Sequence, residues 1–102
     1  MKQFTPETYK EAINSDKLTL VKYKAIWCGP CKVLGPILED VIKEFPDINT
    51  GEIDIDQNTD IAVADGIRGV PTLVFYKNGQ VVDRMVGLQS GPTYTEKIKS
   101  LI

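Results

Sequence analysis

The sequence lacks histidine altogether, and it contains only two cysteines and one tryptophan among 102 residues. Without histidine, the commonest general base and the commonest nitrogen ligand for metals are missing. Long apolar runs are also absent, because no segment approaches the roughly 20 residues that a membrane-spanning helix needs. The first residues carry no apolar segment of the kind found in secretory signal peptides. We therefore expect a cytoplasmic protein that does not contact a membrane.

Charge is balanced along the chain. There are 12 basic and 14 acidic side chains, a net charge of −2, and no basic cluster. Nucleic-acid binding leaves such a cluster as its electrostatic footprint, so we expect no nucleic-acid partner. The apolar fraction of 42% and the charged fraction of 25% are ordinary for a soluble globular protein. We expect one domain over residues 1–102 and a monomer.

Apolar residues follow the periods of helices and of strands in alternation. The helical period predicts helices over 5–14, from Cys28 to Phe45, between Asn58 and Gly66, and after Pro92. Strands are expected over 18–26, 48–56, 72–76 and 81–86, and residues 2–4 are compatible with an edge strand. The Asn78-Gly79 pair is typical of a two-residue hairpin turn. Strands that alternate with helices indicate an α/β fold with parallel pairs, to which the hairpin adds an antiparallel pair.

The two cysteines lie three positions apart, where a predicted strand gives way to a predicted helix. Cys28 is expected at the start of this helix, where free backbone N–H groups and the helix dipole favour a thiolate. A thiolate is the species that attacks disulfides. Cys31 lies about one turn further on and is expected to be less exposed, so it would resolve the mixed disulfide. Gly29 leaves the approach to Cys28 open, and Pro30 preorganises the turn.

Other interpretations of the cysteine pair remain at this stage. A structural disulfide would close a very short loop and would stabilise the fold little. A zinc site would be half filled, because two cysteines without histidine supply two of four tetrahedral ligands. Two inert thiols are the third alternative. A redox couple is the interpretation that we favour, because structural disulfides are rare in the cytoplasm.

Several stretches resemble the thioredoxin family over essentially the whole chain. They are Trp27–Lys32, Pro36–Leu38, Ile55–Asn58, Gly66–Thr72, Lys77–Gly79 and Gly87. The resemblance implies a thioredoxin fold, in which a central mixed sheet of five strands is flanked by four helices. In spatial order the strands would be 2–4, 48–56, 18–26, 72–76 and 81–86.

The resemblance also implies a site and partners. Val70-Pro71 would be a cis peptide beside the cysteines, and the Val70 backbone would pair with an extended substrate. Protein disulfides would be the substrates, and a thioredoxin reductase that holds its own FAD and NADPH would return the electrons. This chain would need no metal and no cofactor beyond the Cys28–Cys31 disulfide. A flat apolar contact surface would be formed by Trp27, Gly29, Pro30, Val70, Pro71 and Gly87.

Two charged positions depart from the family pattern. Lys22 occupies the position of a buried aspartate that the family uses for proton transfer at the second cysteine, and Glu52 occupies that of a lysine. Lys24 stands where an aromatic residue is common. We hypothesise that Glu52, paired with Lys22 behind the cysteines, accepts the proton through water. The alternative is that Lys22 extends to solvent and that Glu52 lies on an open strand face.

Three functions fit these features. The first is a general reductant of protein disulfides that acts through Cys28 as nucleophile and Cys31 as resolving thiol. The second is a glutaredoxin-like protein, or a dedicated electron donor to one enzyme such as ribonucleotide reductase. The third is a non-enzymatic scaffold that uses the same surface. Trp27 and the Gly29-Pro30 dipeptide favour the first.

Overall fold

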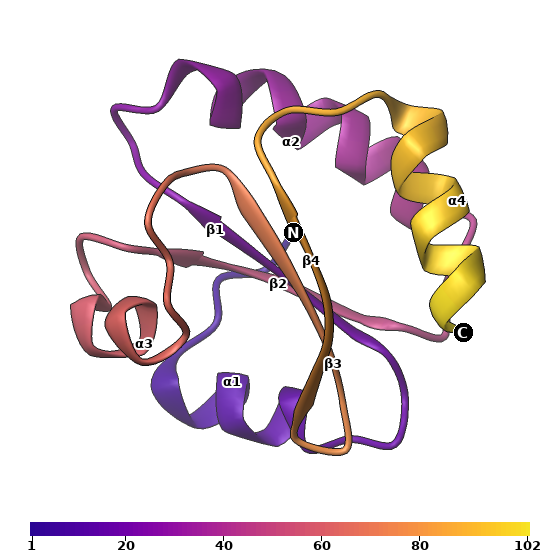
Figure 1. The fold of residues 1–102 in the computed structure, drawn as a ribbon, viewed down its shortest axis with the longest axis horizontal. Helices are drawn as coiled ribbons and strands as arrows, with labels where there is room; N and C mark the ends of the chain where they lie inside the picture. Colours follow the sequence, from indigo (N-terminus) through magenta and orange to yellow (C-terminus); the bar gives the residue numbers. More distant parts are fainter.

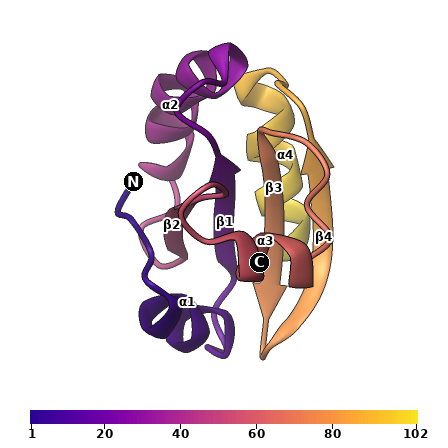
Figure 2. The same ribbon diagram turned by 90° about the vertical axis from the view of Figure 1, so that its left-hand side faces the viewer.

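A computed structural model describes residues 1–102 as a four-stranded sheet between two pairs of helices (Figures 1 and 2). None of the four helices has both the length and the apolar composition needed to cross a membrane. In chain order the elements are α1 (Pro6–Ile13), β1 (Thr19–Lys24), α2 (Gly29–Ile42), β2 (Asn49–Asp54), α3 (Thr59–Ala64), β3 (Thr72–Lys77), β4 (Gln80–Val86) and α4 (Gly91–Leu101).

The sheet has the order β2-β1-β3-β4, with β1 parallel to β2 and antiparallel to β3. The expected order is therefore confirmed for four strands, but the fifth, residues 2–4, forms only an isolated bridge between Gln3 and Glu52. The reason is local. Thr5 already caps α1 and Pro6 occupies its first turn, so too few residues precede the helix to extend a ladder along β2.

The two faces of the sheet carry separate cores. Successive side chains of a strand point to opposite faces, so Leu20 of β1 packs under α2 and α4, whereas Val21 packs toward α1 and α3. Figure 2 shows the helices on the two sides of the strands. By the same alternation, Lys22 and Lys24 fall on the α2 face. Lys24 is the last residue of β1, immediately before the chain turns toward the cysteines.

Several regular elements are shorter than their sequence patterns predict, whereas β3 and β4 each extend one residue further. Strand β1 ends at Lys24 rather than at residue 26, because the chain turns and the Cys28 N–H donates to the Ala25 carbonyl at 3.2 Å. This turn takes Ile26 out of the sheet and leaves it 72% exposed. Helix α2 ends at Ile42, before Phe45. Pro46 explains this, because the residue before a proline is disfavoured in helical conformation.

Candidate redox site

The cysteine pair forms a disulfide at the N-terminus of α2, with the two Cα atoms 5.3 Å apart. Cys28 is the N-cap residue and has an extended backbone. The Cys31 backbone N–H donates to Cys28 Sγ at 3.2 Å. In the reduced protein the same N–H group would be aimed at a Cys28 thiolate, which is the arrangement that favours ionisation at a helix N-terminus.

Both cysteines are buried, each only 4% exposed. The expectation that Cys31 is less exposed than Cys28 is therefore wrong for the disulfide form. The cause is the ring itself, because the bond holds both residues in one small apolar cluster with Ala25. Ile55 and Val70 pack against this cluster. Exposure therefore does not distinguish the roles of the two cysteines, whereas their positions in the first turn of α2 do.

Some residues of the expected contact surface adjoin the disulfide or contact one another. The peptide bond Val70–Pro71 is cis, and Val70 packs against the cysteine cluster. The Gly87 N–H donates to the Pro71 carbonyl at 2.9 Å, and Gly87 adopts a φ of 83°, a conformation that favours glycine. Gly29 and Pro30 are exposed, Val70 and Gly87 are half-buried, and Pro71 is buried.

Trp27 is exposed, at 66% of its surface, as the sequence predicts. Its ring Nε1–H donates to Asp56 Oδ2 at 2.8 Å, so a carboxylate after β2 anchors the indole. The sequence pattern predicts neither a role for Asp56 nor the exposure of Ile26. The only signal for Asp56 was its place in one of the family-like stretches, and Ile26 appeared to continue a strand.

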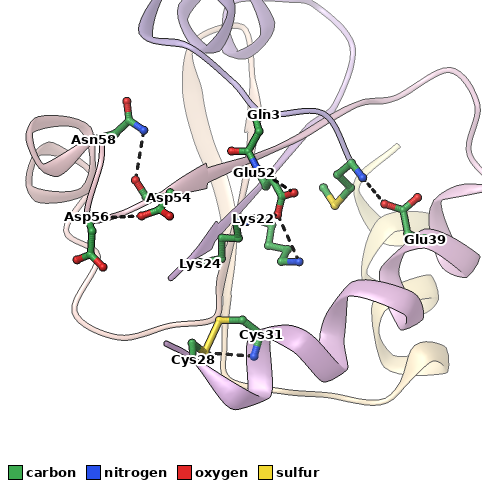
Figure 3. A network of polar contacts seen from close by, with 11 residues as sticks. Gln3, Lys22, Lys24, Cys28, Cys31, Glu39, Glu52, Asp54, Asp56 and Asn58 are labelled. Carbon is green, nitrogen blue, oxygen red and sulfur yellow. Dashed lines mark hydrogen bonds and ion pairs between the residues drawn. A yellow bond between two sulfur atoms is a disulfide. The ribbon is translucent and has the colours of Figure 1, made fainter. Parts of the chain in front are cut away.

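A charged cluster lies on the α2 face of the sheet, behind the disulfide (Figure 3). Lys22 Nζ is 3.6 Å from Glu52 Oε2, and Lys24 Nζ is 3.7 Å from the same oxygen. Gln3 Nε2 donates to the other carboxylate oxygen, Oε1, at 3.2 Å. The Lys22 side chain is only 7% exposed and the Glu52 side chain 14%, so Lys22 does not extend to solvent as the alternative requires.

A cleft of about 350 Å³ connects this cluster with the redox pair. Its lining includes Cys31 from α2, Lys22 and Lys24 from β1, and Glu52 from β2. Gly35, one turn after Cys31, also lines it, and a Cβ at Gly35 would lie 3.8 Å from Lys22 Nζ. The buried ammonium therefore sits directly under the first half of α2. Nowhere in the chain do three or more His, Cys, Asp or Glu side chains come together in a way that could hold a metal ion.

A second polar cluster lies on the opposite face, away from the cysteines. Tyr9, Tyr23 and Tyr76 all donate to one oxygen, Asp65 Oδ2, with Tyr9 at 2.5 Å and Tyr76 at 2.7 Å. Burial, and then the hydrogen bonds to Asp65, raise the pKa of all three phenols well above the usual value. No pattern in the sequence indicates this cluster, because its four members come from four separate segments.

Comparison with known proteins places these features in one family. The family model for thioredoxin matches residues 1–100. A mitochondrial thioredoxin of Bos taurus is 39% identical over 98 residues, which are 95% of this chain and 59% of that protein. Thioredoxin-1 of Saccharomyces cerevisiae is 36% identical over 83 residues, 81% of each chain.

The solved structure of a mutant thioredoxin from Halobacterium salinarum superposes with a TM-score of 0.83 at 36% identity, covering 97% of this chain and 86% of that one. The chain spans less than two thirds of the length of the mitochondrial relatives it matches. The fold, the buried CxxC disulfide and these matches agree, and the chain belongs to the thioredoxin family.

Proposed function

We propose that this protein is a thiol–disulfide oxidoreductase that reduces protein disulfides. The observation that carries the proposal is the Cys28–Cys31 disulfide at the N-terminus of α2, in a chain that matches the thioredoxin family over residues 1–100. A two-electron couple in this position needs no further cofactor in the chain, and the FAD and NADPH of the electron supply belong to a thioredoxin reductase.

The reaction has two exchange steps. The Cys28 thiolate attacks one sulfur of the substrate disulfide, which forms a mixed disulfide and releases the other substrate sulfur as a thiolate. Cys31 then attacks Cys28 Sγ, which restores the Cys28–Cys31 bond and releases the second substrate thiol. The substrate gains two electrons and the chain loses two. The Cys31 N–H at 3.2 Å from Cys28 Sγ supports Cys28 as the nucleophile.

The substrate would lie over the apolar surface beside Cys28. Trp27, Gly29 and Pro30 project from the N-terminal end of α2, and the half-buried Val70 contributes the backbone that pairs with an extended peptide. Pro71 and Gly87 complete the surface through their hydrogen bond at 2.9 Å. An extended substrate segment would gain main-chain hydrogen bonds here in the manner of an added strand.

Glu52 is the proton acceptor that we propose for the second step. Its carboxylate lines the same cleft as Cys31, and the volume of this cleft is sufficient for water to relay a proton. Lys22 holds the carboxylate in place at 3.6 Å. With this assignment Cys31 loses its proton before it attacks Cys28, and Glu52 returns the proton to the departing substrate sulfur.

The proposal also covers the oligomeric state and the cellular location of the protein. We propose one monomeric domain that carries electrons in the cytoplasm from a thioredoxin reductase to protein disulfides. The low cysteine content and the reversible disulfide suit a reducing compartment. The mitochondrial relatives make the mitochondrion the other candidate location.

The proposal is tested by insulin-disulfide reduction, with thioredoxin reductase and NADPH as the electron source. The wild-type chain is expected to turn over, and Cys28→Ser is expected to lose essentially all activity because it removes the nucleophile. A wild type that reduces no disulfide would leave only a scaffold role. A wild type that accepts electrons from glutathione but not from the reductase would indicate a glutaredoxin-like protein instead.

A further inference from the structure

Two ammonium groups in the cleft behind Cys31 have no hydrogen-bonded partner in the protein. Lys22 Nζ and Lys24 Nζ face the same oxygen of Glu52, at 3.6 and 3.7 Å (Figure 3). Hydrogen bonds between charged groups are shorter, at about 2.7–2.9 Å, so both contacts are ion pairs without a direct hydrogen bond. Each ammonium group carries three N–H donors. These donors are therefore available to a ligand in the cleft.

The fold holds the Lys22 ammonium in this position. The Lys22 side chain is only 7% exposed and it lines the cleft, so the ammonium group reaches water through the cleft. A Cβ at Gly35 would lie 3.8 Å from Lys22 Nζ, which places the charge directly under α2. A charge that has lost most of its solvation on folding needs a compensating partner.

The cleft carries more positive than negative charge. Its lining includes the ammonium groups of Lys22, Lys24 and Lys32 and a single carboxylate, that of Glu52. Three positive charges and one negative charge leave two positive charges without compensation. Cys31 does not change this balance, because its sulfur is neutral both in the disulfide and as the protonated resolving thiol.

The neighbouring carboxylate of β2 does not supply the missing negative charge. Asp54 is buried, but its side chain accepts the Asp56 backbone N–H at 2.8 Å and does not line the cleft. Gln3, which donates to the second oxygen of Glu52, is neutral. The compensating anion must therefore come from outside the chain.

The cleft has the size and the opening of a small-molecule site. Its volume of about 350 Å³ lies within the usual range of ligand pockets, roughly 300–1,000 Å³. One water molecule occupies about 30 Å³, so a small anion leaves room for the water that would relay a proton to Glu52. Ile26 lines the cleft and is 72% exposed, which opens the cleft to solvent. None of the six residues of the expected contact surface lines it.

We propose that this cleft binds one small molecule through a phosphate or carboxylate group, whose oxygens accept hydrogen bonds from Lys22 and Lys24. Such charge-assisted hydrogen bonds are about twice as strong as neutral ones. Glu52 competes with the ligand for both lysines, so the binding is weak. The inference goes beyond the proposed function, because it assigns a ligand to a site outside the substrate surface.

The test titrates the oxidised, ¹⁵N-labelled protein with inorganic phosphate and, separately, with acetate, in Tris buffer with sodium chloride added to constant ionic strength. The amide chemical shifts of Ala25, Ile26 and Gly35 should change saturably with at least one of the two ions, with a midpoint on the order of 1 mM. Amides of α1 and α3, on the opposite face of the sheet, should not move. The ion that binds more tightly identifies the group that the site takes. Saturable changes with neither ion would overturn the proposal.

Four variants test whether the two lysines hold the ion. Lys24→Gln is expected to weaken binding by at least about tenfold, because a hydrogen bond to a charged group is lost. Lys24→Arg keeps the charge and the donors and should bind about as tightly as the wild type. Glu52→Gln should bind more tightly, because the competing carboxylate is gone. The matched control is Lys43→Gln, at the far end of α2, where the side chain is 76% exposed and pairs with Asp40; it should bind like the wild type.

Lys22→Gln is also expected to weaken binding, and circular dichroism shows whether this variant folds. If it does not fold, Lys24→Gln carries the test, since its side chain is 24% exposed. The proposal is overturned if Lys24→Gln binds like Lys43→Gln, or if Glu52→Gln weakens binding as the lysine variants do. The titration uses no disulfide substrate and no reduced cysteine, so a failed insulin assay and a failed titration are distinguishable.

Discussion

The free energy of unfolding is expected to fall steeply above about pH 10, because three tyrosines keep their protons only in the folded state. Tyr9, Tyr23 and Tyr76 are 7%, 0% and 2% exposed, and all three donate to Asp65 Oδ2. Ionisation would place a phenolate next to that carboxylate in a buried site. Burial and this hydrogen bonding hold the pKa of each phenol above its ordinary value of 10.0.

The sign and size of the effect follow from linkage. Above pH 10 the unfolded chain releases the three protons that the folded protein retains, so stability decreases as the pH rises. One retained proton corresponds to about 1.4 kcal/mol for each pH unit above the unfolded pKa. The three tyrosines together are therefore expected to remove about 1 kcal/mol at pH 10 and about 4 kcal/mol at pH 11. That is a large part of the roughly 5–15 kcal/mol available to a domain.

The assay is urea denaturation at a series of pH values from 7 to about 11, with tyrosinate absorbance followed in parallel. Tyr23→Phe is expected to lose about 1.5–3 kcal/mol at pH 7, because a hydrogen bond to a carboxylate is gone. Its decline above pH 10 should be shallower by about one third. Lysines titrate in the same range, but they are common to both proteins and cancel in the difference.

Two observations would refute this reasoning. The first is tyrosinate absorbance that rises smoothly near pH 10 while the protein remains folded, since it would mean that the phenols are free to ionise. The second is a pH profile of Tyr23→Phe that runs parallel to that of the wild type. A double-mutant cycle of Tyr23→Phe with Asp65→Asn measures the coupling directly, and it should exceed 0.5 kcal/mol for groups in contact.

Two further changes test the packing and a surface ion pair. Gly51→Ala is expected to destabilise the protein by about 1–3 kcal/mol, because a Cβ there would overlap the Phe4 ring. Phe4→Leu should recover part of this loss in urea denaturation, and equal losses with and without Phe4→Leu would contradict the prediction. Lys97 Nζ lies 2.7 Å from Asp83, and this contact, followed by the Arg84 N–H, lowers the pKa of Asp83. The contribution of the pair to stability is present above the ordinary pKa of an aspartate and is lost as the pH falls through the lowered pKa. Asp83→Asn should therefore reduce the free energy of unfolding by less than about 1 kcal/mol at pH 7 and not at all near pH 2. An equal loss at both pH values would contradict this prediction.

Local signals predicted most of the fold. The Thr5-Pro6 start of α1, the cysteine at the N-cap of α2 and the Asn78-Gly79 turn each depend on the backbone preferences of a few neighbouring residues. In the structure Thr5 and Cys28 accept capping hydrogen bonds from the third helical residue. Asn78 and Gly79 both have positive φ. These features need no tertiary contact, which is why the pattern alone located them.

The features that differ from the sequence-based expectation are those in which another part of the molecule interrupts a local pattern. Residues 2–4 have the extended character expected of a strand, but α1 begins too soon for more than one bridge. Ile26 continues the alternation of β1, but the turn toward Cys28 takes it out of the sheet. The expectation that Cys28 is more exposed than Cys31 was wrong, because the disulfide buries both residues together.

The sequence by itself determined the chemistry of the redox pair: two thiols at the spacing of one helical turn, with the first at a helix N-terminus. The tertiary structure decided what surrounds that pair. Lys22 and Glu52 are opposite each other only because β1 and β2 pair in that register, and Lys24 joins the same carboxylate. Alternation along a strand fixes the face to which a side chain points but not its partner across the sheet. That partner comes from the pairing of β1 with β2, and the packing of α2 over these strands places the charged cluster behind Cys31.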